Sequence, residues 1–164
     1  MNKLHIPPLD EQAAKTALEH QKILAKPPLA LGKLEPVAIQ IAAMTGNPAP
    51  RLKDKAVVLF AADHHIADHG LSLTSTDVTY IQTRNFLQGG GTINAFTRNA
   101  GARLSVVDVG VNYDFGDLPG LVKRKVMHGA NDFSRGPAMT REQALECLQA
   151  VSYTHLTLPT NSLV

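Results

Sequence analysis

The residues of this chain that are best suited to chemistry follow directly after an apolar run. Residues 56–62 read Ala-Val-Val-Leu-Phe-Ala-Ala, and the next seven positions hold five acidic or imidazole side chains: Asp63, His64, His65, Asp68 and His69. Such groups can bind a metal ion, transfer a proton or hold a polar ligand. Ligands of open parallel sheets bind outside the carboxyl ends of the strands, so a strand over 56–62 would bring these side chains to a binding site.

Two interpretations of this cluster stay open: a metal site, or a polar turn with hydrogen-bonded histidines. Carboxylates and imidazoles suit zinc, manganese or iron. Adjacent side chains of an extended segment point to opposite faces, so Asp63 and His65 can converge, while His64 joins them only through a tight turn. The triplet also resembles that of the manganese phosphoesterase superfamily named after it. Residues 1–62 lack the upstream Asp-x-Asp of that superfamily, and we expect a polar turn without a metal.

Composition predicts one soluble domain with a sizeable core. The 164 residues are 44% hydrophobic and 18% charged, and a chain near this length buries about 68 to 70% of its unfolded surface without a metal or a disulfide. The single cysteine, Cys147, excludes an intrachain disulfide and favours a reducing compartment. Residues 1–10 contain no apolar leader, and no run approaches the roughly 18 apolar residues of a membrane span. We therefore expect a cytoplasmic protein with no membrane partner.

The charge distribution argues against nucleic acid as a partner. Lys and Arg number 16 and Asp and Glu 14, and the net charge of +2 is spread along the chain, without a basic stripe. No Trp and only three Tyr are present for base stacking. The one cluster, Lys123-Arg124-Lys125, is flanked by valines, and we expect it to be the solvated end of a strand.

Residues 1–50 are predicted to form a small helical segment. Asp10 can cap a first helix, which Pro27-Pro28 ends. Apolar residues spaced by about 3.6 positions predict a second helix from Leu34, and Pro36 is tolerated there because it falls in the first turn.

Residues 51–150 alternate between strand and helix patterns, which predicts a partial α/β/α domain. Continuous apolar runs indicate buried strands, and helices are expected between and after them. The expected strands are 56–62, 104–111 and 121–127; the expected helices are 77–87, 92–100 with Ile93, Phe96 and Ala100 inward, and one from a capping box at 140–143. Strand, helix, strand order requires a right-handed parallel crossover. The predicted fold class is α/β: an incomplete, Rossmann-like, three-layer α/β/α parallel sheet.

Gly89-Gly90-Gly91 has two interpretations. Successive glycine amides ahead of a helix can hold a phosphate. The triplet follows a predicted helix, however, and matches neither the P-loop nor the dinucleotide-binding fingerprint, so a helix break is the expected role.

The last residues depart from the pattern of the helix before them. Residues 151–164 lack Lys, Arg, Asp and Glu and carry β-branched residues and a proline, which do not favour a helix. This segment is similar to the translated read-through of a sequencing adaptor or vector, and we interpret it as a non-native tail.

Four blocks of the sequence together indicate a family: residues 26–35, 61–64, 106–111 and 135–141. In this order and spacing they resemble the nicotinate-nucleotide:dimethylbenzimidazole phosphoribosyltransferases of cobalamin synthesis, over about residues 10–150. The resemblance implies transfer of the phosphoribosyl group of nicotinate mononucleotide to 5,6-dimethylbenzimidazole. Nicotinate is released, α-ribazole 5′-phosphate forms, and no metal or redox cofactor is required.

The same resemblance implies roles for a few residues. Thr74 and Gln82 match positions that help to form the benzimidazole pocket of the family. Asp63 and His64 would form part of the crevice wall. The catalytic glutamate of the family lies in the part that follows residue 150 of this chain, so no catalytic residue is assigned here.

Departures from the family pattern lead to further expectations. His65 replaces a usual glycine and Leu29-Ala30 replaces a usual Gly-Ser, so we expect the local turns to differ. Family members are longer, so the chain is expected to be an N-terminal fragment, inactive alone, of an enzyme that is a homodimer at full length. Two alternatives stay open: a metal-dependent phosphoesterase built on Asp63-His64-His65, and a non-catalytic ligand-binding module.

Overall fold

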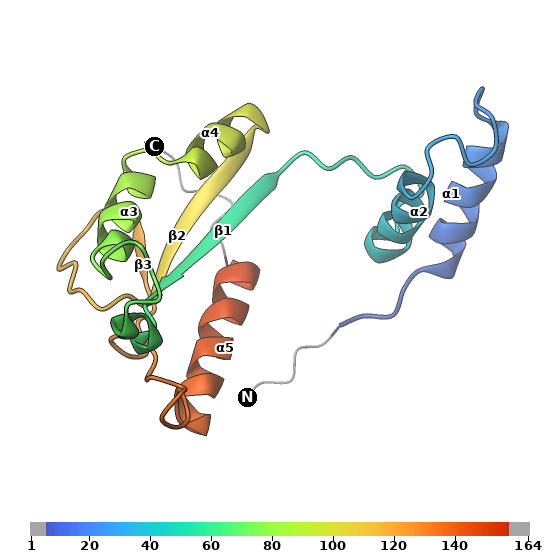
Figure 1. The fold of residues 1–164 in the computed structure, drawn as a ribbon. Coiled ribbons are helices and arrows are strands. Elements are labelled where there is room, and N and C mark those ends of the chain that lie inside the picture. Colours follow the sequence, from blue (N-terminus) through green and yellow to red (C-terminus); the bar gives the residue numbers. More distant parts are fainter. Residues whose placement is uncertain (1–5, 158–164) are drawn as a thin grey trace. The chain divides into compact units, whose positions relative to one another are not determined.

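The computed structural model describes residues 6–157. These residues form two compact units, with the division between Lys53 and Asp54. The first unit is a pair of helices, α1 (Glu11–Ile23) and α2 (Leu34–Thr45). The second holds a parallel sheet and the remaining helices (Figure 1).

Both predicted helices of the N-terminal segment are present. Asp10 caps α1, because its Oδ1 accepts a hydrogen bond from the Ala13 amide at 2.9 Å. Gly46 ends α2 with a left-handed φ of +63°, a conformation that costs glycine little. The two helices pack through small side chains, and their buried apolar residues are all alanines: Ala13, Ala17, Ala42 and Ala43.

One turn of this helical unit departs from ordinary backbone geometry. Leu29 has a φ of +60°, in the left-handed region that favours glycine. It lies where the family pattern predicts glycine, so the turn carries backbone strain. The chain is held next to it by Glu35, whose Oε1 lies 2.7 Å from Lys26 Nζ and accepts the Leu31 amide at 3.2 Å. The Lys26 ammonium, and then the Leu31 amide, lower the pKa of Glu35 below its ordinary value.

The sheet of the second unit consists of three parallel strands in the order β1-β2-β3. β1 (Lys55–Ala62) pairs with β2 (Ala102–Gly110), and β2 pairs with β3 (Leu121–Lys123). The predicted α/β class and its first two strands are confirmed. The third strand is shorter than predicted, because residues 124–127 leave the regular pairing.

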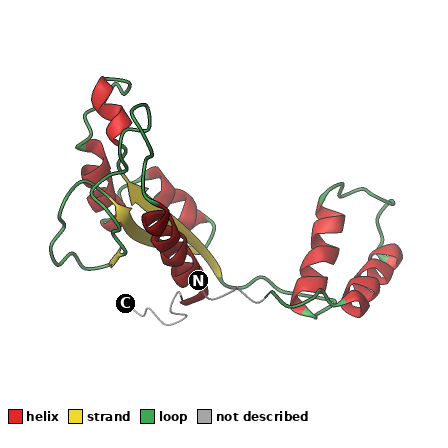
Figure 2. Cartoon of the chain, turned by 90° about the horizontal axis from the view of Figure 1, so that it is seen from below, coloured by secondary structure: helices red, strands yellow, loops and turns green. Residues whose placement is uncertain are grey.

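Helices lie on both sides of this sheet. In Figure 1, α3 (Val78–Leu87) and α4 (Thr92–Asn99) are on one side of β1 and β2, and α5 (Arg141–Thr157) is on the other. A 3₁₀ turn, η1 (His65–His69), follows β1 directly. Long loops connect β2, β3 and α5, as the green segments of Figure 2 show.

The core of the unit lies between the sheet and α3. Its buried members are Ala61, Val106, Val111, Phe115 and Leu121. Three side chains of α3, those of Tyr80, Phe86 and Leu87, pack against this cluster. The apolar residues of the strands thus pack against α3.

The predicted inward face of α4 is wrong for two of its three residues. Ile93 is half-buried, but Phe96 is 70% exposed and Ala100 is exposed, whereas Asn94 and Thr97 are buried. Asn94 takes the inner position because its side chain accepts the Gly91 amide at 3.0 Å and donates to the Phe86 carbonyl at 2.8 Å. The inner position of α4 is therefore taken by Asn94, which caps the helix, and not by the Phe96 ring.

The capping box ahead of α5 is confirmed. The Gln143 side chain accepts the Thr140 amide at 2.8 Å, and the Thr140 hydroxyl accepts the Gln143 amide at 3.2 Å. The α5 backbone continues to Thr157, past the position where the sequence pattern changes. Residues 158–164 of the predicted tail lie outside the described residues, and its foreign origin stays a prediction.

No helix within residues 6–157 has the length and apolar character needed to cross a membrane.

Candidate functional site

β1 and β2 end side by side, and Asp63 ties the two ends together. The register shifts at this point, because Ala61 pairs with Asp108 but Ala62 pairs with Gly110. The Asp63 amide then donates to the Gly110 carbonyl at 3.0 Å. Its carboxylate is buried and accepts the Asn112 amide at 2.7 Å. The Asp63 side chain therefore fixes the backbone that follows β2.

A second buried carboxylate organises the end of β2. Asp108 is 3% exposed, and its Oδ1 accepts the amides of Gly110 and Val111 at 3.1 and 2.9 Å. Its other oxygen lies 3.2 Å from Lys125 Nζ. Lys125 also donates to the carbonyls of Val111 and Tyr113. The two charges compensate each other in a buried position, where an unpaired charge would destabilise the fold.

The Asp108–Lys125 pair corrects one prediction from the sequence. Lys125 is not a solvated strand end, since its side chain is only 20% exposed. The signal was present: Asp108 interrupts an apolar run, and such a buried carboxylate needs a partner. Sequence alone did not say which of the 16 Lys and Arg residues supplies it.

The loop that Lys125 holds contributes aromatic rings to the strand ends. Tyr113 stacks on Tyr80 of α3 with ring centroids 4.4 Å apart. Phe115 meets Tyr113 edge-on at 5.1 Å. Arg84 lies over the Tyr113 ring at 5.5 Å and donates to its hydroxyl at 3.3 Å. This stack joins α3, which carries Gln82, to the end of β2.

The three histidines after β1 have different surroundings. His64 is exposed and forms an isolated parallel bridge with Ala130. The His65 ring contacts Asp68 and the carbonyl of His128. His69 Nε2 lies 2.7 Å from Asp132 Oδ2. The ring contacts of His65 and His69 both link η1 to the segment 128–132.

The ionic surroundings of these loops shift two pKa values. Asp68, and then the His128 carbonyl, raise the pKa of His65. The Ser134 hydroxyl, together with His69, lowers the pKa of Asp132 to about 2. Both shifts have the same cause, since the ionised form of each group is hydrogen-bonded by the neighbouring loop residues.

The two residues matched to the benzimidazole pocket are exposed. Thr74 lies in the loop after η1, where its hydroxyl is 3.0 Å from that of Ser72. Gln82 lies in the second turn of α3, as predicted, and its Oε1 accepts from Asn85 Nδ2 at 3.2 Å. Each side chain therefore bonds within its own segment. Both remain reachable by a ligand.

The structure does not assemble the cluster after β1 into a metal site. Within residues 6–157, no group of three or more His, Cys, Asp and Glu side chains has an arrangement that could hold a metal ion. Asp63 is directed to the Asn112 amide, and His65 and His69 each pair with a separate carboxylate. Nothing in this arrangement favours the metal-dependent phosphoesterase.

The glycine triplet is a tight helix connection. The Gly89 and Gly90 amides donate to the Phe86 and Asn85 carbonyls, and Gly91 donates to Asn94. A Cβ at Gly91 would lie 2.4 Å from the Phe86 ring. All three amides are engaged, so the triplet offers no phosphate cradle.

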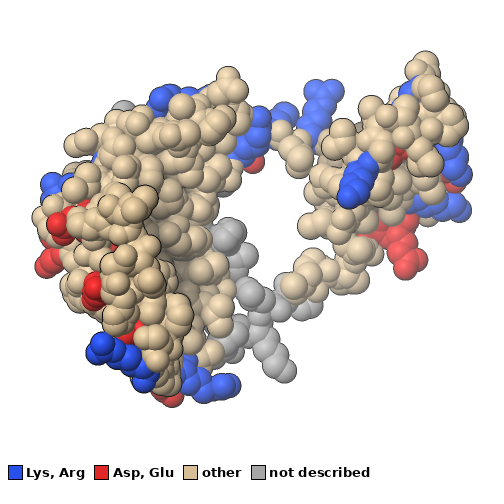
Figure 3. All heavy atoms as spheres, viewed as in Figure 1, with Lys and Arg blue, Asp and Glu red and all other residues tan. Residues whose placement is uncertain are grey.

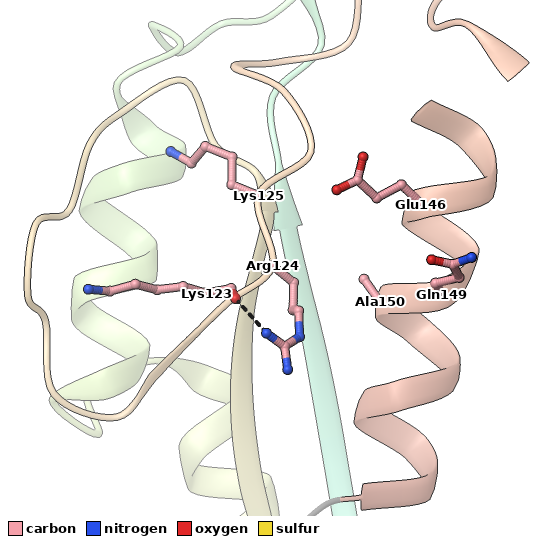
Figure 4. Close-up of a pocket in the computed structure, with 6 residues that line it drawn as sticks. All are labelled: Lys123, Arg124, Lys125, Glu146, Gln149 and Ala150. Atoms are coloured by element: carbon pink, nitrogen blue, oxygen red, sulfur yellow. Dashed lines mark hydrogen bonds between the residues drawn. The ribbon is translucent and has the colours of Figure 1, made fainter. Parts of the chain in front are cut away.

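Two cavities lie beside the segment after β3. One of about 540 Å³ separates this segment from α5, and Figure 4 shows Arg124 reaching toward α5 while Lys123 and Lys125 extend the other way. Glu146 and Gln149 of α5 line its far wall. Another of about 230 Å³ lies among Asp108, Lys125 and His128. The face drawn in Figure 3 shows basic side chains at several separate places.

A parallel sheet with polar side chains and aromatic rings gathered at its strand ends is typical of α/β proteins that bind small molecules there. The sequence profile of a family described as Phosphoribosyltransferase (DBI_PRT) matches residues 6–155, and the chain belongs to this family. The resemblance found in the sequence is thereby confirmed.

Curated relatives agree with this assignment. The chain is 46% identical over 145 residues to the nicotinate-nucleotide–dimethylbenzimidazole phosphoribosyltransferase of Chloroflexus aggregans, covering 88% of this chain and 41% of the relative. It is 45% identical over 142 residues to the enzyme of the same name from Geobacter sulfurreducens, covering 87% and 40%. The chain thus spans about two fifths of the length of these relatives.

Solved structures give the same result. A crystal structure of the enzyme so named from Thermus thermophilus matches with a TM-score of 0.82 and 43% identity, over 87% of this chain and 43% of that chain. A structure titled CobT from the same organism also has a TM-score of 0.82, at 38% identity, over 90% and 45%. The predicted fold is that of this family.

Proposed function

We propose that this chain contributes to phosphoribosyl transfer from nicotinate mononucleotide to 5,6-dimethylbenzimidazole, which yields α-ribazole 5′-phosphate and nicotinate for cobalamin synthesis. The observation that carries the proposal is the match of residues 6–155 to the family, with its polar groups at the strand ends. Because the chain spans about two fifths of its relatives, we assign it part of the site.

The reaction defines what a site must provide. One benzimidazole nitrogen forms a bond to C1′, and the bond between C1′ and the nicotinate nitrogen breaks with its electron pair leaving on nicotinate. The proton on the other benzimidazole nitrogen passes to a general base. A protein therefore has to align the two rings and hold the base near the acceptor. Neither a metal nor a redox cofactor takes part.

We assign the acceptor side of this site to the region after β1. The Thr74 hydroxyl and the Gln82 amide can each donate and accept a hydrogen bond, and both are exposed. Their present partners, Ser72 and Asn85, are local and can be exchanged for a ligand. Asp63 and His64 form part of the crevice wall, with Asp63 in a supporting role because its carboxylate accepts a backbone amide.

The general base is not assigned to the carboxylates at these strand ends. Asp63 and Asp108 accept backbone amides, and Asp108 also pairs with Lys125. These contacts engage the carboxylate oxygens within the protein, so neither side chain is directed at an acceptor. We therefore propose that the described residues bind and orient the acceptor without catalysing the transfer.

Binding and turnover of the chain 1–164 test this proposal separately. With nicotinate mononucleotide and dimethylbenzimidazole, chromatography should detect no α-ribazole 5′-phosphate. Dimethylbenzimidazole alone should shift the amide NMR signals of Thr74 and Gln82. Loss of one hydrogen bond in Thr74→Val or Gln82→Leu should weaken binding roughly 2- to 12-fold.

The matched control is Gln88→Leu, which removes another exposed glutamine at the end of α3 and should leave binding unchanged. Turnover at the rate of an ordinary enzyme would contradict the proposal that the described residues supply no general base. Binding that is equal in the wild type, Thr74→Val and Gln82→Leu would overturn the assignment of the acceptor site.

We further propose that the full-length protein is a homodimer that acts in the cytoplasm on these small-molecule substrates. The family resemblance supports the dimer. The single cysteine of the chain, Cys147, supports a reducing compartment, since one cysteine allows no intrachain disulfide.

A further inference from the structure

We propose that His65 is a proton-dependent clasp, which ties η1 to the segment 128–130 only while both of its ring nitrogens carry a proton. The inference concerns a residue where this chain departs from the family pattern. It goes beyond the proposed function, because it assigns a conformational role that needs no substrate.

The geometry places one acceptor at each ring nitrogen. Nδ1 lies 2.9 Å from Asp68 Oδ2, and Nε2 lies 3.1 Å from the carbonyl oxygen of His128. An ionised carboxylate and a carbonyl oxygen can only accept a hydrogen bond. Both contacts therefore require the ring to donate twice.

A neutral imidazole cannot make both contacts. It has a single N–H, and its other nitrogen is an acceptor, which would face the lone pairs of a second acceptor. Loss of one proton thus breaks one of the two bonds. The ionic partner retains the remaining proton, so the bond lost is the one to the His128 carbonyl.

The ring is closely enclosed on the side of the carbonyl. A Cβ at Gly129 would lie 3.1 Å from His65 Nε2. The backbone of the same segment pairs with the residues that follow β1, since the His65 amide donates to the Ala130 carbonyl and the Ala130 amide donates to the Asp63 carbonyl. The side-chain bond therefore reinforces a two-bond backbone ladder.

The charged groups around the ring favour the protonated form. Asp68 on η1 is the main cause of the raised pKa of His65, followed by the His128 carbonyl, and Asp63 at the end of β1 adds a smaller attraction. The segment 128–130 brings only the His128 ring as a titratable side chain, and this ring lines the cavity beside Asp108 and Lys125. Exposed His64 and His69 flank the ring in sequence, and His69 pairs with Asp132.

The direction of the pH dependence follows from the raised pKa. The clasp is fully closed below 6.5, the ordinary pKa of histidine. It opens as the pH rises through the higher pKa of the folded protein. The His65 side chain is 37% exposed, so solvent can remove the proton. Opening removes one of the contacts between η1 and the segment 128–132, while the two backbone bonds and the His69–Asp132 contact remain.

His69 provides the internal comparison. Its ring makes one contact, from Nε2 to Asp132 at 2.7 Å. A neutral ring with its proton on Nε2 keeps this contact, so deprotonation does not break it. Deprotonation thus breaks a hydrogen bond of His65 but not the contact of His69 on the same turn.

The test is NMR of the chain 1–164. Histidine ring nitrogens titrated with pH give the pKa of His65, and hydrogen exchange gives the protection of the Ala130 amide. We expect a pKa above 6.5 in the wild type, lowered in Asp68→Asn. Protection should fall roughly 2- to 12-fold through this pKa, the effect of one hydrogen bond.

Two variants separate the clasp from general stability. His65→Gln cannot titrate, so the protection of Ala130 should not change across the same pH range. His69→Gln should keep the pH response of the wild type. A His65 pKa at or below 6.5, a pKa unchanged in Asp68→Asn, or a pH response that persists in His65→Gln would overturn the proposal. None of these readouts depends on a ligand, so failure here leaves the proposed function untouched.

Discussion

Leu29 and His65 both stand where the family pattern has glycine, and the structure accommodates them in different ways. Leu29 keeps a left-handed backbone, with a φ of +60°, and its side chain is 75% exposed. His65 has no positive φ, and its ring makes two hydrogen bonds. The first site carries backbone strain under an exposed side chain, whereas at the second the ring of the replacing residue gains two contacts. Loss of a glycine can therefore be a cost at one turn and a new interaction at another.

The largest expected effect tests how closely the chain encloses the His65 ring. Gly129→Ala places a Cβ 3.1 Å from His65 Nε2 in a backbone with φ +75°. The left-handed backbone alone costs about 1–2 kcal/mol, and the contact with the ring adds to it. We expect a loss of about 2–3 kcal/mol in the free energy of unfolding, measured by urea denaturation.

Gly116→Ala is the matched control for this change. Gly116 has a φ of +57° with nothing within 4 Å of an added Cβ, so only the backbone cost of about 1–2 kcal/mol applies. Equal losses in the two variants would show that the segment 128–130 does not enclose the ring.

The next effect has the opposite sign and concerns Leu29. Leu29→Gly removes about 1–2 kcal/mol of left-handed strain but adds about 0.5–1 kcal/mol of backbone entropy to the unfolded state. We expect a net stabilisation of about 0.5–1 kcal/mol for the helical unit, measured by urea titration of the amide signals of α1 and α2. Ala30→Gly relieves no such strain and should destabilise; a loss of stability in both variants would contradict the strained turn.

The smallest effect concerns Asp132, the carboxylate that contacts His69 of η1. The pKa of Asp132 is about 2, below its ordinary 3.8, because Ser134 and then His69 bond its ionised form. This contribution to stability is present above 3.8 and is lost as the pH falls through about 2. His69→Gln should raise the pKa of Asp132 only in part, because the Ser134 hydroxyl is the larger cause, and carboxyl-carbon NMR measures the shift. A return to 3.8 would show that His69 alone sets it.

Much of the fold was predictable from local patterns. Asp10, Gly46 and the 140–143 capping box mark helix ends because their side chains or backbone act within a few residues. The strand over 56–62 follows from a continuous apolar run, which a sheet covered by helices requires. The third strand was predicted too long: regular pairing ends at Lys123, and Lys125 bonds the carbonyls of Val111 and Tyr113 beyond β2.

The sequence predicted that polar side chains gather at the end of β1, but it did not give their partners. Asp63 accepts the Asn112 amide, and His65 and His69 contact Asp68 and Asp132. Phe96 failed as an inward residue because Asn94 takes that position to cap α4. Lys125 was missed as an ionic partner since no local pattern connects it to Asp108.

The sequence by itself determined the family, the α/β class and the strand exit at which polar residues gather, because these depend on ordered motifs and on apolar periodicity. Only the tertiary structure decided the partners: Asp63 with Asn112, Asp108 with Lys125, and His65 with His128. The first and last of these contacts join residues 49 and 63 positions apart. The free energy of a hydrogen bond or an ion pair depends on distance, direction and burial, which composition and spacing along the chain do not specify.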